Sequence, residues 1–473
     1  MNPVSDQSLG IDLNNDRLPS AQYRILLRLA IPVVLSQVSH TFMGIADTII
    51  VGQTGDVGML AASSLANNVF SVPIVFAIGM SYGATPKVAE YFAQKNYGLC
   101  QQILRNSLLN NLLWTFFLCG LLYLLLPFSG LMGQDPTVLS QAIPFFELLI
   151  WGLPGIMLFQ TIRQFYDGLG NTRPGMVASV AANVLNVILN YLLIYGKFGF
   201  PAMGLMGSGL ATFIARSSMG LGLLGYFYWS KQTSIWRKGL FSSFVEKGIL
   251  GMLNRMGIPI SLQFLFEVGA FSFTAVIIGQ MGIHALAAHQ VVISIASVSY
   301  MMASGLSAAA SIRVGHFVGL QDKAMIRLSG KRSMQMVVVF MSFMAFLFIG
   351  FREVIPMLFT DNHQVLAASS SLFLIAGIFQ ISDGIQVVGL GCLRGLSDVR
   401  IPTLITFIAY WIIAIPLGYW LGVELKWGLS GTWWALLAGL SISALFMYLR
   451  FFTLLPSFTF KPAPVPVLLS DEV

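Results

Sequence analysis

Two acidic residues stand alone inside long apolar stretches of this sequence. Glu267 lies in the middle of PISLQFLFEVGAFSFTAVIIG, residues 259–279, and Asp383 lies in FQISDGIQVVG, residues 379–389. The residues around them offer neither acid a basic partner. Two buried carboxylates repel each other and lose hydration, and both effects favour binding of a proton or of a cation such as Na⁺. The alternative is a protonated carboxyl that is hydrogen-bonded into helix packing.

Amide side chains accompany both acids at helical spacing. Gln263 lies one turn before Glu267, and Gln380 and Gln386 lie three residues to either side of Asp383. In a helix each of these sets shares a face. We therefore expect both faces to avoid lipid and to form one cation or proton site, with the glutamines as supporting polar groups.

A second polar group is expected earlier in the chain. Asp47 lies in MGIADTIIVG, and Asn183, Asn186 and Asn190 lie in NVLNVILNY, where the last two asparagines are one turn apart. Amide oxygens are hard ligands that suit Na⁺ or a protonated carboxyl. Two plainer interpretations stay open. Asp47 can be a solvated acid near a helix end, and the asparagines can serve as hydrogen bonds between helices.

Two more charges fall inside apolar stretches. Glu147, in PFFELLIWG, lies near the outer end of its stretch and is interpreted as an interface residue. Arg216, in ATFIARSSMG, lies near the middle of its stretch and should pair with an acid or extend towards the membrane surface. We expect Arg216 to form a structural ion pair, but its acidic partner cannot be predicted from the sequence.

Membrane helices must carry these residues. Of the 473 residues, 56% are hydrophobic and only 10% charged, and the mean hydropathy is +0.78, whereas soluble domains carry about 25% charged residues. Apolar runs of about 20 residues recur along the chain, and each is long enough to span a bilayer as a helix. The sequence therefore predicts an all-α membrane protein with twelve transmembrane helices, at residues 25–50, 60–84, 104–126, 138–162, 174–195, 203–229, 255–279, 285–309, 333–351, 364–391, 402–422 and 429–452.

The two halves of the chain resemble each other. IIVGQTG at 49–55 matches VIIGQMG at 276–282, and GLGNTR at 168–173 matches GLSDVR at 395–400, both with an offset of 227 positions. A constant offset over separated segments indicates a duplicated unit of six helices. Because six is even, both copies start on the same side of the membrane, which predicts two pseudo-symmetric bundles with a cleft between them.

The repeat also sets the predicted domain boundaries. We expect an N-lobe at 23–229 and a C-lobe at 250–455, joined by a cytoplasmic linker at 230–249. The flanking segments, 1–22 and 456–473, are predicted to be cytoplasmic tails, and the Pro-rich second tail to be disordered.

The net charge of +7 reflects how the loops are placed on the two sides of the membrane and does not indicate a nucleic-acid partner. Basic residues concentrate in every second loop, as in the segment that contains Lys231, Arg237, Lys238 and Lys247, whereas the opposite loops hold only Lys197, Arg352 and Lys426. Cytoplasmic loops of membrane proteins carry this excess of Lys and Arg, so both termini are predicted to be cytoplasmic. The three cysteines, Cys100, Cys119 and Cys392, show no metal-type spacing.

Several segments together resemble the multidrug and toxic compound extrusion (MATE) transporters of the bacterial NorM-like branch. They are ADTIIVG (46–52), NVILNYLLIYGKFG (186–199), LAAHQVVIS (286–294), AASIRVGHFVG (309–319) and SDGIQVVGLGCLRGLSD (382–398). The resemblance covers roughly residues 22–455. It implies the twelve-helix, two-lobe MATE fold in a bacterial inner membrane. It also implies a monomer that needs no cofactor and exports organic cations in exchange for Na⁺ or H⁺.

The resemblance also implies roles for the polar residues. Glu267 and Asp383 match the C-lobe pair that binds the coupling cation, so Na⁺ is expected there. Asp47, Asn186 and Asn190 match the N-lobe cation or proton site. This chain has Phe379 where NorM-like relatives often have Tyr, so a hydroxyl ligand is lost at that position. That loss shifts the expectation slightly towards H⁺.

Other functions stay open from the residues alone. A flippase for lipid-linked oligosaccharide, or an exporter of a metabolite, would share the architecture, but the flippase would need a basic cleft to hold pyrophosphate. A channel or receptor would not need the duplicated lobes and paired acids. An intramembrane enzyme is disfavoured because the sequence has no phosphate loop, HExxH or nucleophile elbow.

Overall fold

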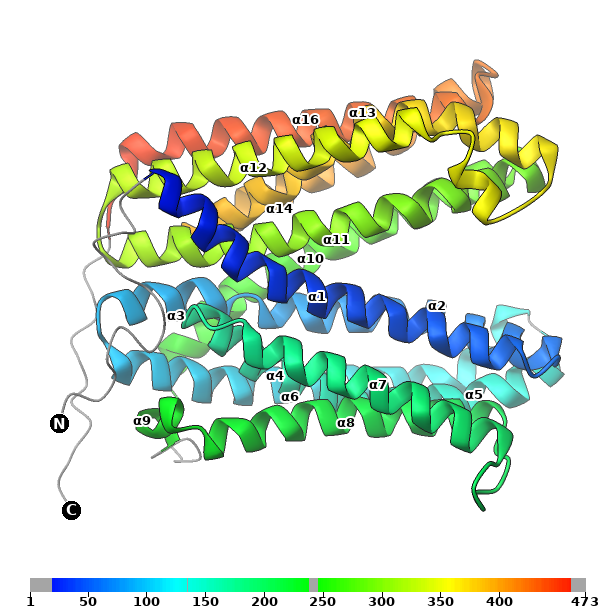
Figure 1. Ribbon diagram of the computed structural model, residues 1–473, viewed down its shortest axis with the longest axis horizontal. Coiled ribbons are helices and arrows are strands. Elements are labelled where there is room, and N and C mark those ends of the chain that lie inside the picture. Colours follow the sequence, from blue (N-terminus) through cyan, green and yellow to red (C-terminus); the bar gives the residue numbers. More distant parts are fainter. Residues whose placement is uncertain (1–18, 134, 238–245, 461–473) are drawn as a thin grey trace. The chain divides into compact units, whose positions relative to one another are not determined.

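The computed structural model describes residues 19–133, 135–237 and 246–460, and its regular structure over these residues is helical throughout (Figure 1). Eleven helical stretches there are long and apolar enough to cross a membrane. The twelfth predicted span, 203–229, corresponds to α8, Leu205–Trp229, whose glycines, serines and Arg216 make it less apolar. Its 25 residues are still enough to cross a hydrocarbon core of about 30 Å.

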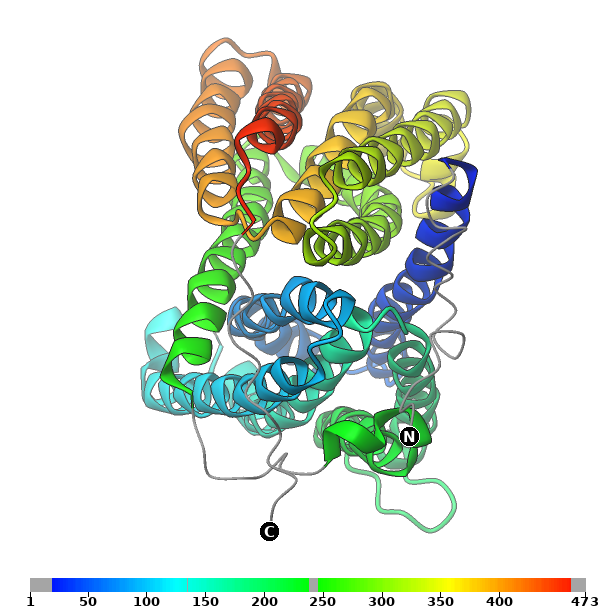
Figure 2. The same cartoon turned by 90° about the vertical axis from the view of Figure 1, so that its left-hand side faces the viewer.

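The chain divides into two compact units. Within the described residues, unit 1 comprises 35–261, and unit 2 comprises 19–34 and 262–460. The helices of each unit are seen nearly end-on in Figure 2.

Unit 1 contains the first copy of the repeat. Apart from the parts of α1 and α10 that lie in it, its elements are α2 Val57–Ser81, α3 Ala84–Ala93, α4 Tyr97–Leu125, η3 Leu126–Met132, α5 Pro136–Trp151, α6 Leu153–Gly168, α7 Arg173–Tyr195, α8, η4 Lys231–Thr233 and α9 Ser234–Arg237. Helix α6 is the central helix, because it is buried over almost its whole length and packs against α4 and α8.

Unit 2 contains the second copy. Apart from its parts of α1 and α10, its elements are α11 Ile283–Gly319, α12 Lys323–Gly350, η5 Ile355–Leu358, α13 His363–Gly395, α14 Arg400–Phe407, η6 Ile408–Ala414, α15 Ile415–Tyr419, η7 Trp420–Glu424 and α16 Gly428–Ser457. Helix α13 packs against α11, α12 and α16 and is the central helix of this unit (Figure 1). Asp383 therefore lies on the central helix of unit 2.

Two helices change unit partway along their length. Residues 19–34 of α1, Pro19–Gly52, belong to unit 2, where Gly305 of α11 lies against Val34. Residues 247–261 of α10, Lys247–Gly279, belong to unit 1, where the Ser261 hydroxyl donates to the Phe76 carbonyl oxygen at 2.7 Å. The predicted lobes follow the sequence repeat, whereas the compact units exchange the first halves of these two helices.

Helix caps and glycine contacts recur in both copies. Asn96 caps α4 and Asp322 caps α12, 226 positions later, each by accepting a backbone N–H. Asp135 and Asn362, 227 positions apart, cap α5 and α13 in the same way. Gly168 and Gly395 also match, because a Cβ on either would lie 2.6 Å from the Cβ of a valine, Val88 or Val314. The duplication therefore extends to local hydrogen bonding and packing.

Some predicted elements differ in detail. The tail predicted at 1–22 is helical from Pro19, and the tail predicted from 456 is helical to Ser457, while residues 1–18 and 461–473 lie outside the described residues. In the linker, 231–237 form η4 and α9, and 238–245 lie outside the described residues. The span predicted at 402–422 contains two π-helical segments, η6 and η7, which hydropathy does not reveal.

Candidate cation-binding sites

The acids of unit 2 lie close enough to act on each other. Glu267, on α10, and Asp383, on α13, are buried, with 4% and 3% of their surface exposed, and the two side chains interact electrostatically. Glu267 Oε1 has no hydrogen-bond partner within the described residues. The structure thus brings together the two acids that the sequence placed 116 positions apart.

Each supporting glutamine of unit 2 uses its carbonyl oxygen in a hydrogen bond. Gln263 Oε1 accepts from Arg394 at 3.2 Å, Gln380 Oε1 accepts from Ser299 at 2.7 Å, and Gln386 Oε1 accepts from Tyr410 at 3.1 Å. The three Nε2 groups are buried and lack a partner in the part of the chain that is described. These N–H groups can donate to water but cannot bind a cation, so the free oxygen for a cation is Glu267 Oε1.

Arg394 corrects one expectation from the sequence. No basic partner was expected for either acid, yet the Arg394 guanidinium interacts electrostatically with Glu267 and lies 4.9 Å from the centre of the Phe264 ring. Arg394 follows Asp383 by 11 residues on α13, which is about three helical turns, so both project from roughly the same face. The apolar stretch around Asp383 ends before Arg394, so a search confined to that stretch missed it.

The polar group of unit 1 forms a hydrogen-bonded cluster. Asn190 Nδ2 donates to Asp47 Oδ1 at 2.6 Å and to Asn186 Oδ1 at 3.1 Å. Thr212, on α8, donates to Asp47 Oδ2 at 3.3 Å and accepts from Asn186 Nδ2 at 3.4 Å. Asp47, Asn186 and Asn190 thus lie together, and Thr212 joins them. Thr212 could not be predicted, because a lone threonine in an apolar helix is common.

Arg216 lies near this cluster but does not form the expected close ion pair. Its guanidinium lies 5.1 Å from the centre of the Phe70 ring, and its charge acts on Asp47 at longer range. Among the described residues no acid forms a salt bridge with it. The arginine is therefore held by a cation–π contact. Asp47 is its charge partner.

The remaining predicted polar residues lie apart from the two acid sites. Asn183 donates to the Ser39 hydroxyl, so it links α7 to α1. Glu147 is half-buried on α5.

Sequence reasoning also missed a buried ion pair in unit 1. Arg163 Nε lies 3.6 Å from Asp167 Oδ2 on α6, and both side chains are almost fully buried. The predicted span ended at residue 162, so both charges were assigned to a loop.

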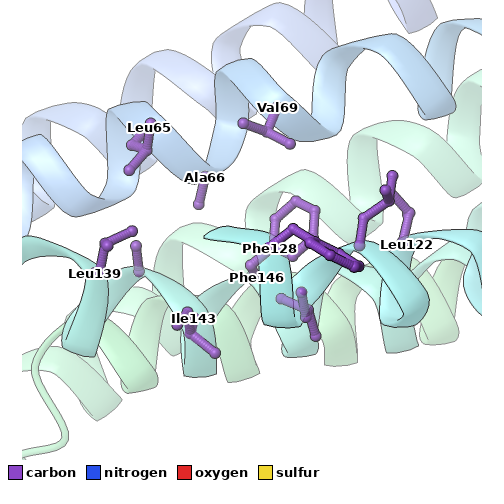
Figure 3. Close-up of a pocket in the computed structure, with 11 residues that line it drawn as sticks. Leu65, Ala66, Val69, Leu122, Phe128, Leu139, Ile143 and Phe146 are labelled. Carbon is purple, nitrogen blue, oxygen red and sulfur yellow. The ribbon is translucent and has the colours of Figure 1, made fainter. Parts of the chain in front are cut away.

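Unit 1 also contains an apolar pocket that is lined by no charged or polar side chain. It has a volume of about 200 Å³ and lies between α2, α4, η3 and α5 (Figure 3). Its lining consists of Leu, Ile, Val, Ala and Phe side chains, among them Leu65, Leu122 and Phe146. It can accommodate an apolar group but offers no ligand for a cation.

The donor atoms of the two acid sites limit what they can bind. Within the described residues no three His, Cys, Asp or Glu side chains gather as a metal site. The two sites instead combine carboxylate, amide and hydroxyl oxygens, which suit a proton or a hard cation. A helical membrane protein with such sites in both halves of a duplicated scaffold belongs to the class of secondary transporters.

Comparison with known proteins identifies the family. Residues 32–192 and 259–420 match the MatE family, so the two matched segments start 227 positions apart, as the repeat does. The chain is 34% identical over 435 residues to the "Multidrug resistance protein NorM" of Photobacterium profundum, with 90% of this chain and 94% of the relative covered. It is also 34% identical over 439 residues to the "Multidrug resistance protein MdtK" of Yersinia pseudotuberculosis, with the same coverage.

The fold agrees with this result. The structure is similar to the Vibrio cholerae MATE transporter VcmN in the bent form, with a TM-score of 0.82 and 19% sequence identity over 93% of this chain and 98% of that one. The protein therefore belongs to the MatE family and has the twelve-helix MATE fold.

Proposed function

We propose that this chain is a secondary active multidrug efflux transporter that exports organic cations in exchange for Na⁺ or H⁺ by alternating access. It is a transporter and not an enzyme, as its membership in the MatE family implies. The efflux function is supported by relatives named multidrug resistance proteins that match nine-tenths of the chain. In unit 2 two acids, Glu267 and Asp383, stand against one base, Arg394, and this excess of negative charge supports cationic substrates.

One observation carries the coupling mechanism: Glu267 and Asp383 are buried together and interact electrostatically. Two carboxylates in a low-dielectric interior are stabilised when a cation or a proton binds between them. Binding of the coupling cation in one state of the transporter, and of the substrate in the other, then couples their movements. Each ligand need only prefer one state.

The cluster around Asp47, Asn186 and Asn190 is proposed as a second cation or proton site. Both Asp47 oxygens already accept hydrogen bonds, so this carboxylate is held in a fixed orientation. We further propose that the protein acts as a monomer without a cofactor in a bacterial inner membrane. The distribution of its basic loops supports cytoplasmic termini.

Efflux of ethidium from preloaded, energised cells tests the coupling pair. Wild type, Glu267→Gln, Asp383→Asn and Glu147→Gln should be compared after a pulse of Na⁺ at fixed pH and after a pulse of acid without Na⁺. We expect the first two substitutions to reduce ion-driven efflux at least about tenfold, equivalent to about 1.4 kcal/mol. Glu147→Gln removes a half-buried acid outside both sites and should behave like wild type.

The pulses also decide between the remaining alternatives. Efflux driven by Na⁺ identifies a Na⁺-coupled exporter, and efflux driven only by acid makes the same carboxylates proton carriers. If Glu267→Gln and Asp383→Asn both export like wild type, the assignment of the coupling site is wrong. Absence of ethidium efflux from wild-type cells would instead favour a metabolite or a lipid-linked oligosaccharide as substrate.

A further inference from the structure

A π-helical segment of unit 2 faces both helices that carry the acids. Within η6, Tyr410 donates to Gln386 Oε1 on α13 at 3.1 Å, and the next residue, Trp411, donates to the Phe266 carbonyl oxygen on α10 at 3.0 Å. Consecutive side chains of a helix point in different directions, about 100° apart in an α-helix. Tyr410 and Trp411 can therefore reach two different helices. π-Helical segments within α-helices are also frequent at functional sites.

Tyr410 is placed beside the acids. Its side chain is fully buried, and both Glu267 and Asp383 act on it electrostatically. Its ring lies 6.0 Å from the ring of Phe271, which holds it from the side. Trp411 meanwhile bonds the backbone immediately before Glu267. The π-helical segment thus connects to both acid-bearing helices at the level of the site.

The hydrogen bond to Gln386 leaves the Tyr410 oxygen free to act as a ligand. A phenol has one proton to donate and lone pairs to accept with, and Tyr410 gives its proton to an amide carbonyl. Its oxygen lone pairs remain available in a region that contains two carboxylates. A neutral oxygen adds a ligand for a cation without adding another repelling charge.

Phe379 explains why this oxygen matters. It is buried on α13, with its ring centre 6.2 Å from that of Phe271 and 5.8 Å from that of Trp433. Phe379 is thus part of an apolar wall and offers no oxygen. The hydroxyl expected to be missing at position 379 is available from a different helix.

We infer that Tyr410 is a ligand of the coupling-cation site and selects Na⁺ over H⁺, with its hydroxyl oxygen completing the set formed with Glu267 and Asp383. The inference rests on the proposed function. Na⁺ binding gains from every additional oxygen at suitable distance, whereas a proton can be held by a single carboxylate. Removal of this hydroxyl should therefore weaken Na⁺ coupling and leave acid-driven transport unchanged.

Tyr410→Phe tests this inference because it removes one oxygen and preserves the ring. We expect the Na⁺ concentration for half-maximal ethidium efflux to rise about tenfold, with acid-driven efflux and the yield of folded protein unchanged. Tyr419→Phe is the matched control, because Tyr419 lies on the same span with its side chain 43% exposed, and it should not alter the Na⁺ dependence. NaCl should raise the melting temperature of the purified wild-type protein more than KCl does. Tyr410→Phe should lose most of this difference, and Tyr419→Phe should retain it.

Other outcomes separate the inference from the proposed function. If Glu267→Gln abolishes Na⁺-driven efflux but Tyr410→Phe leaves the Na⁺ dependence unchanged, the coupling site stands and the role of Tyr410 is overturned. Parallel loss of acid-driven and Na⁺-driven efflux in Tyr410→Phe would also overturn it, because the tyrosine would then be a packing residue. If Glu267→Gln has no effect, the proposed coupling site itself fails.

Discussion

The two acid sites differ in how completely their polar atoms are satisfied. In unit 1 both oxygens of Asp47 accept hydrogen bonds from Asn190 and Thr212, and one cluster atom, Asn190 Oδ1, lacks a partner within the described residues. In unit 2, by contrast, Glu267 Oε1 and the Nε2 groups of three glutamines have no hydrogen-bond partner within the described residues. An unpaired buried polar group costs about 1–3 kcal/mol. Water can pair with the N–H groups and a cation with Glu267 Oε1, so unit 2 gains more when water and a cation enter. This difference favours unit 2 as the site where ion occupancy changes most.

The buried ion pair between Arg163 and Asp167 gives a prediction about the stability of the protein. Asp167→Asn removes one charge of a buried pair and leaves the arginine uncompensated, so we expect a loss of about 3–5 kcal/mol of stability. The double substitution Arg163→Met with Asp167→Leu should lose less, because apolar residues replace both charges. Thermal unfolding of purified protein in detergent would measure this. If the double variant unfolds at a lower temperature than Asp167→Asn, the pair does not act through burial of charge.

The sequence identified the acids and amides of both sites but not their neighbours. Glu267, Asp383 and Asp47 were recognisable because a carboxylate in an apolar stretch is costly, and Asn186 and Asn190 because of their spacing. Thr212, Tyr410 and Ser299 come from other helices and are ordinary residues for a membrane helix. Only the packing of distant helices shows that they contact the amides and acids.

At the scale of helices, two glycine contacts set how closely neighbouring elements approach. A Cβ on Gly168 would lie 2.6 Å from Val88 Cβ, and a Cβ on Gly395 would lie 2.6 Å from Val314 Cβ. We expect Gly168→Ala and Gly395→Ala each to cost about 1–3 kcal/mol through overpacking. Gly222→Ala is the matched control, because nothing lies within 4 Å of the added carbon.

Rescue would show that the cost comes from this contact. Adding Val88→Gly to Gly168→Ala removes the Cβ that the new carbon would meet, so the double variant should lose less stability than the sum of the two single substitutions. A Gly222→Ala variant that is as unstable as the other two would mean that glycine flexibility, and not close approach, is what the helices require.

Hydropathy located the spans but not their internal breaks. Eleven predicted spans have helices that are both long and apolar, and α8 was found although its polar residues lower its hydropathy. The break between α5 and α6 at Gly152, and the π-helical segments η6 and η7, depend on local hydrogen bonding. An average of side-chain hydropathy over a window does not predict which backbone carbonyl accepts a hydrogen bond from each backbone N–H.

At the scale of the whole molecule, one duplicated scaffold carries different chemistry in its two copies. The offset of 227 positions relates His40 to Glu267 and Asp167 to Arg394. The second copy therefore has an acid where the first has an imidazole, and a base where the first has an acid. Caps and glycine contacts are retained between the copies while these polar positions differ. The repeat thus predicts the architecture of each copy but not the chemistry of its site.

The exchange of half-helices gives a prediction for the molecule as a whole. A fragment of residues 1–240 lacks the first half of α10, which supplies unit 1 with the hydrogen bonds of Ser261 to Phe76 and of Asn254 to Trp114. A fragment of residues 241–473 lacks the first half of α1, where Val34 packs on Gly305 and Tyr23 accepts from Arg332. Each fragment is therefore missing part of the unit that it mostly contains.

We expect neither fragment to accumulate in the membrane as a protease-resistant species when it is expressed alone. Co-expression of the two fragments should restore resistance, because each then supplies the half-helix that the other lacks. A fragment of residues 1–262 retains the first half of α10 and should resist limited proteolysis better than 1–240. Equal resistance of these two fragments would show that unit 1 does not need the first half of α10, and the division of the chain into these two units would then be wrong.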